Sequence, residues 1–190
     1  MKEPRRRVDV RRLSHIDRSG RPRMVDVGER PVTARHAVAE AEIALEQSTL
    51  SLVIDGGAEK GDVLTVAELA GVMAAKRTPE LIPLAHPLPL TNVKVEIRPD
   101  RAAGALRIRA AASTMAQTGV EMEALTAAAV AALTVYDMLK SVDRAAEIRH
   151  LRLVEKSGGR SGVWRRSDAE RPPRAGSLRP GTRGPKRNRG

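Results

Sequence analysis

The chain has 190 residues, which suits one domain, and its 34 Lys and Arg against 23 Asp and Glu give a net charge of +11. It contains no cysteine, which excludes disulfides, thiolate metal sites and a cysteine nucleophile. It also contains no phenylalanine, so its core must be built from Ala, Val, Leu, Ile and Met. The net charge belongs to the ends: residues 1–12 carry +4, residues 165–190 carry +7, and residues 13–164 hold 19 charges of each sign.

From this distribution we expect a disordered basic arm at residues 1–12, one folded domain at 13–164 and a disordered basic tail at 165–190. The tail is rich in Pro, Gly and Arg and has almost nothing to bury against the entropy of ordering. The charged start lacks an apolar stretch behind it, which argues against a secretory signal. The most apolar segment, 124–136, is shorter than the roughly 20 residues of a membrane span. We therefore expect a soluble, cytoplasmic protein.

The first half of the domain contains strand and helix patterns in alternation. Residues 24–27 are expected to form a short strand. Residues 32–45 are rich in alanine, yet their side chains alternate with period two, which favours a strand. Residues 62–76 predict a helix with Asp62 as N-cap and an apolar stripe formed by Val63, Val66, Ala67, Ala70 and Met73. Four prolines predict a rigid, irregular loop over residues 78–90.

The second half predicts a hairpin, a helix and a last strand. The hairpin pairs residues 93–97 with 106–112, the long helix covers 119–140, and the strand at 148–154 precedes a Gly/Ser loop at 157–162. The resulting order, βαββαβ, is typical of a ferredoxin-like α+β sandwich. That fold hosts many activities and specifies none of them.

The long helix carries charged residues at both ends. Asp137 and Lys140 share one face, either as a surface ion pair or as a carboxylate that tunes an amine for proton transfer. Glu121 and Glu123 lie in the first turn, where a helix dipole favours carboxylates, so they either cap the helix or bind a ligand. At 1.5 Å per residue, Glu121 and Asp137 are roughly 24 Å apart. Either one end of the helix is only structural, or the site is shared between subunits.

Three loops contain further candidates. His86 lies between prolines, where it either fills a turn or takes part in the chemistry. Lys60 lies among glycines, in a segment that is either a turn joining two helices or a close approach of the backbone to a ligand, and the P-loop pattern is absent. The Gly/Ser loop after Lys156 is able to present backbone amides to a phosphate. The four histidines are scattered, so we predict no metal site, and two aromatic residues are too few for base stacking on a sheet.

Five segments together resemble a known family. They are MVDVGERPVTAR at 24–35, KGDV at 60–63, AKRTPELIPLAHPLPL at 75–90, TGVEMEALTAAAVAALTVYDMLK at 118–140 and KSGGRSG at 156–162. In this order and spacing they resemble the cyclic pyranopterin monophosphate synthase (MoaC) family of molybdenum cofactor biosynthesis. The resemblance covers about residues 13–164, and GVEMEALTA followed by YDM is its most specific part.

The resemblance implies a lyase that converts a 3′,8-cyclised dihydroguanosine triphosphate to cyclic pyranopterin monophosphate and releases pyrophosphate. It implies a homohexamer, a trimer of dimers with active sites between subunits, and neither a membrane nor a nucleic-acid partner. It implies no required cofactor, and Mg²⁺ accompanying the triphosphate is compatible with it. The alternative function is a non-enzymatic ferredoxin-like module whose basic tails bind nucleic acid, since phosphate contacts need such cations.

The resemblance also assigns roles to individual residues. Asp137 matches the catalytic acid or base, and Lys140 is its partner in proton transfer. The remaining residues bind the substrate, through its ring system or its phosphates: Leu84, Ala85, His86, Glu121, Met122, Glu123, Lys60, Lys76, Lys156 and, as the weakest candidate, Arg35. Ala85 stands where the family commonly has Cys, so a thiol at that position is not essential if this protein is active.

Overall fold

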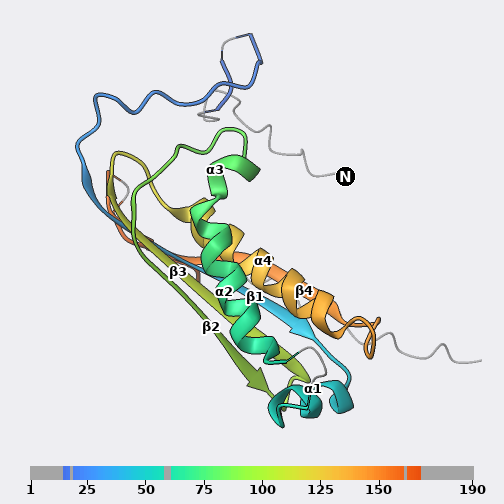
Figure 1. The fold of residues 1–190 in the computed structure, drawn as a ribbon. Coiled ribbons are helices and arrows are strands. Elements are labelled where there is room, and N and C mark those ends of the chain that lie inside the picture. The colour runs from blue at the N-terminus through green and yellow to red at the C-terminus, as the bar shows by residue number, and fades with distance from the viewer. Residues whose placement is uncertain (1–14, 18, 58–60, 161, 168–190) are drawn as a thin grey trace, which may run out of the picture.

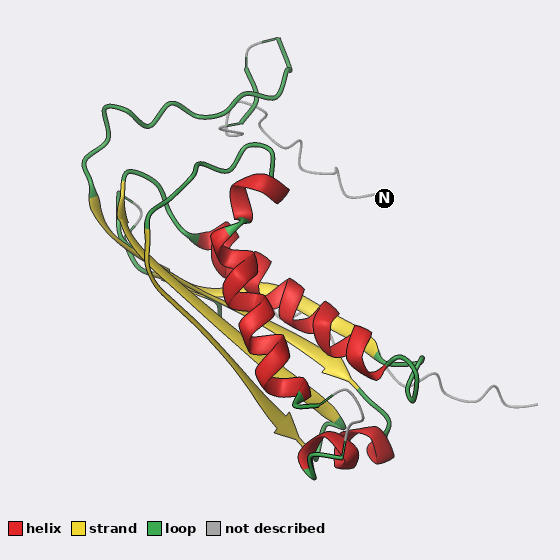
Figure 2. Ribbon diagram, viewed as in Figure 1, coloured by secondary structure: helices red, strands yellow, loops and turns green. Residues whose placement is uncertain are grey.

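The computed structural model describes residues 15–17, 19–57, 61–160 and 162–167. An antiparallel sheet in the order β2-β3-β1-β4-β5 is covered on one face by α2 and α4 (Figures 1 and 2). The strands are β1 (Thr33–Ala44), β2 (Leu90–Asp100), β3 (Ala105–Ala116), β4 (Glu147–Ser157) and β5 (Trp164–Arg165). The helices are α1 (Gln47–Ile54), α2 (Val63–Lys76), α3 (Thr78–Leu81) and α4 (Glu121–Leu139).

The long elements confirm the ferredoxin-like α+β prediction. Their order is β1, α2, β2, β3, α4, β4, and the sheet places β1 and β3 in the middle. The strand predicted at 32–45 is β1, with Ala37, Ala39 and Ala41 buried beneath the helices. Alternation therefore predicted this segment better than the helix propensity of alanine, because β1 buries one face against α4 and pairs with a strand on each side.

The core between sheet and helices is made of small side chains. Helix α4 buries Ala124, Ala127, Ala128, Ala131 and Ala132 completely. A Cβ atom added to Gly71 of α2 would lie 2.9 Å from the backbone oxygen of Ala127 and 3.1 Å from Val95 Cγ2. The two helices therefore pack with almost no side chain between them at this point.

Helix α4 also has the length and composition of a membrane span. More than half of it, 56%, is buried inside the protein. The most apolar segment, residues 124–136, is shorter than a membrane span, but the whole helix is not. Its burial therefore identifies α4 as the core helix of this fold.

The buried face of α2 differs from the predicted stripe. Asp62 caps the helix as expected, accepting a hydrogen bond from Thr65 N at 3.0 Å. Val66 and Met73, however, are each 44% exposed, and the buried residues are Val63, Ala67, Gly71, Ala74 and Ala75. The prediction of Val66 and Met73 as core residues was wrong because the close approach to α4 favours small residues over large apolar ones.

Two other predictions need correction. Residues 24–27 form no strand, and the nearest pairing is an isolated bridge between Ile16 and Pro22. Within 78–90, the four-residue helix α3 begins with Pro79 in its first turn, where a missing N–H costs no hydrogen bond. The basic arm, Lys60 and the tail beyond residue 167 lie outside the described residues.

The outer edge of β2 is partly closed by side chains. Glu68 of α2 accepts a hydrogen bond from Ile97 N at 2.9 Å. Two residues further along, on the same side of the strand, Pro99 has no N–H to offer. The edge thus presents fewer unpaired donors than an ordinary edge strand.

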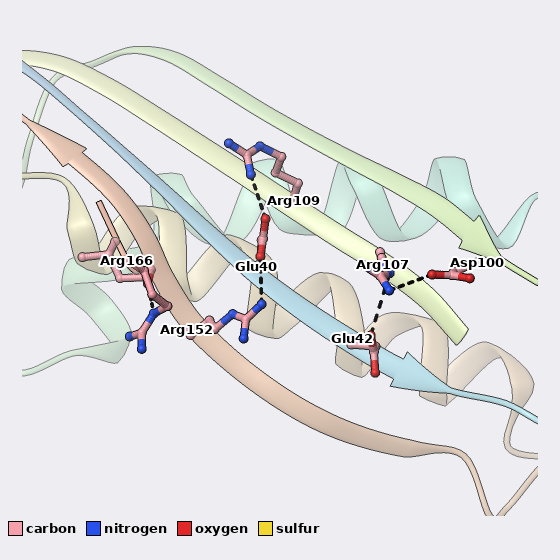
Figure 3. Close-up of polar contacts among 8 residues, drawn as sticks. Glu40, Glu42, Asp100, Arg107, Arg109, Arg152 and Arg166 are labelled. Atoms are coloured by element: carbon pink, nitrogen blue, oxygen red, sulfur yellow. Dashed lines mark hydrogen bonds and ion pairs between the residues drawn. The ribbon is translucent and has the colours of Figure 1, made fainter. Parts of the chain in front are cut away.

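The sheet face opposite the helices carries charged side chains in pairs. Glu40 lies between Arg109 and Arg152 of the neighbouring strands, at 2.7 and 3.4 Å (Figure 3). Glu42 lies 3.9 Å from Arg107, which also pairs with Asp100 at 2.7 Å. These cross-strand pairs keep the helix-free face polar, although each contributes only about 0.2–1 kcal/mol.

The contact at Gly71 predicts a cost for any larger residue. Gly71→Val should lower the free energy of unfolding by about 1–3 kcal/mol, because the new methyl groups must displace the backbone of α4. Urea denaturation measures the change. Leu69→Val on the exposed side of the same helix is the control and should change it by less than about 0.5 kcal/mol. Equal stability of Gly71→Val and the native protein would contradict the packing argument.

Candidate active site

A cleft of about 860 Å³ lies at the end of the sheet where β1 and α4 begin and β4 ends. Its walls come from the segment before β1 and the start of that strand, from the loop at 84–88, from residues 118–123 and from residues 156–160. Figure 1 shows the chain before β1 crossing this end of the molecule. A cleft of this size accommodates a nucleotide-sized ligand.

Most of the residues predicted from the sequence meet in this cleft. Those that line it are Arg35, Leu84, Ala85, His86, Glu121, Met122, Glu123 and Lys156. Lys76, Asp137 and Lys140 do not line it, and Lys60 cannot be placed because it lies outside the described residues. One subunit therefore assembles eight of the ten predicted binding residues but not the predicted catalytic pair.

His86 is held in one orientation. Its Nε2 atom lies 2.9 Å from the backbone oxygen of Val25. Because a carbonyl oxygen can only accept, Nε2 carries a proton, and Nδ1 remains as the second functional atom of the ring. The loop that carries His86 is itself fixed by a turn, which the hydrogen bond from Ala85 N to Ile82 O closes at 2.9 Å.

Glu121 and Lys156 form an ion pair on the cleft wall. The Lys156 Nζ atom lies 3.0 Å from Glu121 Oε1, and both side chains are about one third exposed. The carboxylate folds back over Gly119, where any side chain would collide with it. The pair joins the end of β4 to the first turn of α4, so much of the positive charge of Lys156 is balanced within the protein.

Glu123 is the buried acid of the cleft, with only 3% of its surface exposed. Burial raises the pKa of its carboxyl group, and the nearby Glu121 adds to the effect, while the backbone N–H of Glu123 opposes it. The carboxyl group therefore keeps its proton to higher pH than an ordinary glutamate. Such a group can donate a proton as well as accept one.

Arg35 supports the loops on both sides of the cleft. Its Nε and Nη2 atoms donate to the backbone oxygens of Ala116 and Gln117 at 3.4 and 3.3 Å. Gly158 and Gly159, both with positive φ, cross directly over its side chain, and a Cβ at Gly159 would overlap the guanidinium group. Arg35 thus connects the end of β3 to the loop after β4.

Asp137 and Lys140 lie at the far end of α4. Lys140 Nζ donates to Asp137 Oδ1 at 2.6 Å, and both side chains are more than half exposed. The hydrogen bond to Asp137 raises the pKa of the Lys140 amine. Within one subunit the amine is therefore held as an ammonium ion.

Four of the ionisable residues that line the cleft escaped the sequence-based prediction: His15, Arg30, His36 and Arg160. Arg30 and Arg160 belong to the segments 24–35 and 156–162, which were selected for other residues. His36 follows Arg35 in β1. The alternating pattern there predicted a strand with two faces, but not that His36 lines a cleft. In the part of the chain that the structure describes, no three His, Asp or Glu side chains group to hold a metal ion.

A cleft that combines a buried carboxyl group, an oriented imidazole and several cations is typical of an enzyme that acts on an anionic small molecule. Comparison with protein families makes the assignment specific. The model of the MoaC family matches residues 24–159, and the chain belongs to this family.

Several relatives are similar over nearly their whole length. A protein of Thermomicrobium roseum is 60% identical over 158 residues, which are 83% of this chain and 95% of the relative. Proteins of Brucella ovis and Chloroflexus aggregans are 57% and 54% identical, with 83% and 84% of this chain and 95% and 97% of the relatives covered. All three are named cyclic pyranopterin monophosphate synthase.

The burial of Glu123 predicts a pH-dependent stability difference. Because the folded-state pKa is raised, the contribution of this group is fully present below the unfolded pKa of about 4.3 and is lost as the pH rises through the folded-state pKa. Glu123→Gln cannot ionise, so its free energy of unfolding relative to the native protein should increase as the pH rises from 4 to 8. Urea denaturation across that range measures the difference. A difference independent of pH would exclude a raised pKa.

Proposed function

We propose that this chain is a cyclic pyranopterin monophosphate synthase. It converts 3′,8-cyclised dihydroguanosine triphosphate to cyclic pyranopterin monophosphate and releases pyrophosphate. The observation that carries the proposal is the cleft, in which Glu121, Glu123, His86 and Lys156 converge. The names and identities of the relatives support it. The alternative, a non-enzymatic module that binds nucleic acid through its tails, has no support among these relatives.

The reaction needs both proton transfer and charge stabilisation. The imidazole-derived part of the purine opens, the pyranopterin ring forms, and the α-phosphate closes into a cyclic phosphate as pyrophosphate leaves. Glu123, whose pKa is raised by burial, is suited to exchange a proton with the substrate. His86 Nδ1 exchanges a proton or hydrogen bond with the substrate, and Glu121 accepts from the N–H groups of its guanine-derived ring. Lys156 faces the charge that develops on the leaving phosphates.

The catalytic pair reaches the cleft from another subunit. Asp137 and Lys140 are exposed and lie roughly 24 and 28 Å along the helix axis from Glu121, too far to join the same ligand. Exposed apolar side chains at the cleft support a contact with another subunit. Met122 lines the cleft and is 37% exposed, and Met24 and Val32, which adjoin lining residues in the chain, are 48% and 59% exposed. The proposed assembly is the homohexamer, a trimer of dimers, that the resemblance to the family implies, and its proposed location is the cytoplasm. Lys60 and Lys76 keep their proposed role in binding the triphosphate.

The role of Asp137 is tested by pyrophosphate release from the cyclised substrate. Asp137→Asn should lower kcat by several orders of magnitude, because the amide neither takes up a proton nor holds Lys140 as a charged partner. Glu96→Gln removes a partly exposed carboxylate in the middle of the edge strand β2 and should leave the rate unchanged. Equal rates for Asp137→Asn and the native protein would remove Asp137 from the chemistry, and no release by the native protein would contradict the proposed function.

The shared site is tested by mixing two inactive variants. Asp137→Asn and His86→Ala are combined in equal amounts, dissociated and reassembled. If each site takes Asp137 from one subunit and His86 from another, a random mixture regains roughly a quarter of the native activity. If both residues of a site belong to one subunit, the mixture stays inactive. Each variant reassembled alone is the control.

A further inference from the structure

The cations of the cleft differ in how far the protein already uses them. Lys156 is paired with Glu121, and Arg35 donates to two backbone oxygens. Arg30 and Arg160 also line the cleft, yet their guanidinium groups make no hydrogen bond or ion pair with any other described residue. Among the described residues of the cleft, Arg30 and Arg160 therefore keep charge that no hydrogen bond or ion pair occupies, whereas Lys156 and Arg35 share theirs with protein groups.

Both arginines are presented by short, fixed segments. Arg30 ends a turn in which its backbone N–H donates to Val27 O at 2.9 Å, immediately before β1. Arg160 follows Gly159, whose backbone lies on the side chain of Arg35. The segments flank the same end of the sheet, because β1 begins where β4 ends. A guanidinium group is always charged and matches two phosphate oxygens at once.

His36 lies at the start of β1 between these segments. In the sheet it stands opposite Ser113 of β3 and Ser157 of β4, and its Nδ1 atom lies 3.0 Å from Ser113 Oγ. Its ring lines the cleft, and Nε2 forms no hydrogen bond with the residues that the structure describes. When the Ser113 hydroxyl donates to Nδ1, Nε2 carries the proton and can donate to an anion.

We propose that Arg30, His36 and Arg160 bind the phosphate chain of the ligand. The identity of that chain as the triphosphate of the cyclised nucleotide rests on the proposed function, whereas the anion site itself rests on the two arginines, whose guanidinium groups no described residue pairs. Arg30 and Arg160 hold the phosphate oxygens, and His36 donates from Nε2. The ring system then lies toward Glu121, Glu123 and His86.

Calorimetric binding of inorganic tripolyphosphate to the native full-length protein tests the anion site without any turnover. Arg30→Gln and Arg160→Gln should each weaken binding by about tenfold to hundredfold at constant ionic strength, because each loses charge-assisted hydrogen bonds. His36→Asn should weaken it severalfold, and Arg30→Lys should retain part of the affinity. Arg98→Gln removes a highly exposed arginine on β2 and should bind as the native protein does.

Unchanged affinity in both arginine variants, or no binding of tripolyphosphate by the native protein, would overturn the proposal. So would an equal loss in Arg98→Gln, since that would indicate general attraction to a basic protein. Steady-state kinetics with the cyclised substrate gives a second result: the variants should raise KM and leave kcat near the native value. If the native protein binds tripolyphosphate through these residues but turns over no substrate, the anion site stands and the proposed function fails.

Discussion

The contact between α2 and α4 at Gly71 and Ala127 is the constraint on which the rest of the structure depends. A core without phenylalanine and rich in alanine reaches normal packing density only if helices and sheet approach closely. This approach fixes the path of α4 across the sheet. The first turn of α4, with Glu121 and Glu123, therefore arrives at the end of the sheet where β1 begins, and the cleft forms there. The position of the chemistry follows from the size of the core side chains.

Much of the fold could be predicted because its long elements have clear periodicity. The alternation in β1 and the length of α4 are local properties, visible in the sequence. Helix α1 has no comparable signal. The N–H of Glu46, which precedes it, donates at 2.8 Å to the buried Asp143, 97 residues away, so its position depends on tertiary structure. The apolar stripe of α2 was misplaced for a similar reason, since only the position of α4 decides that Gly71 is buried and Met73 is not.

The site residues could be predicted where they belong to long motifs. Whether a charged side chain is available to a ligand could not be predicted, because that depends on which residues lie beside it in the folded protein. Lys156 and Arg160 look equally available in the sequence, but Glu121 pairs with the first and no described residue pairs with the second. Arg35 likewise is a cation in the sequence, but in the structure its guanidinium group donates to the backbone and supports the loops around it. For Asp137 and Lys140 the difficulty is different. The sequence correctly predicts that they are neighbours at one end of the long helix, but in a single subunit that end does not line the cleft.

The closed edge of β2 has a consequence for the protein at high concentration. A foreign strand that paired there would have to displace Glu68 from Ile97 and would then meet Pro99, which cannot donate. Growth of the sheet into a fibril through this edge is therefore disfavoured from the folded state. Copies of this chain can therefore associate through side chains at other surfaces with less competition from strand pairing along β2.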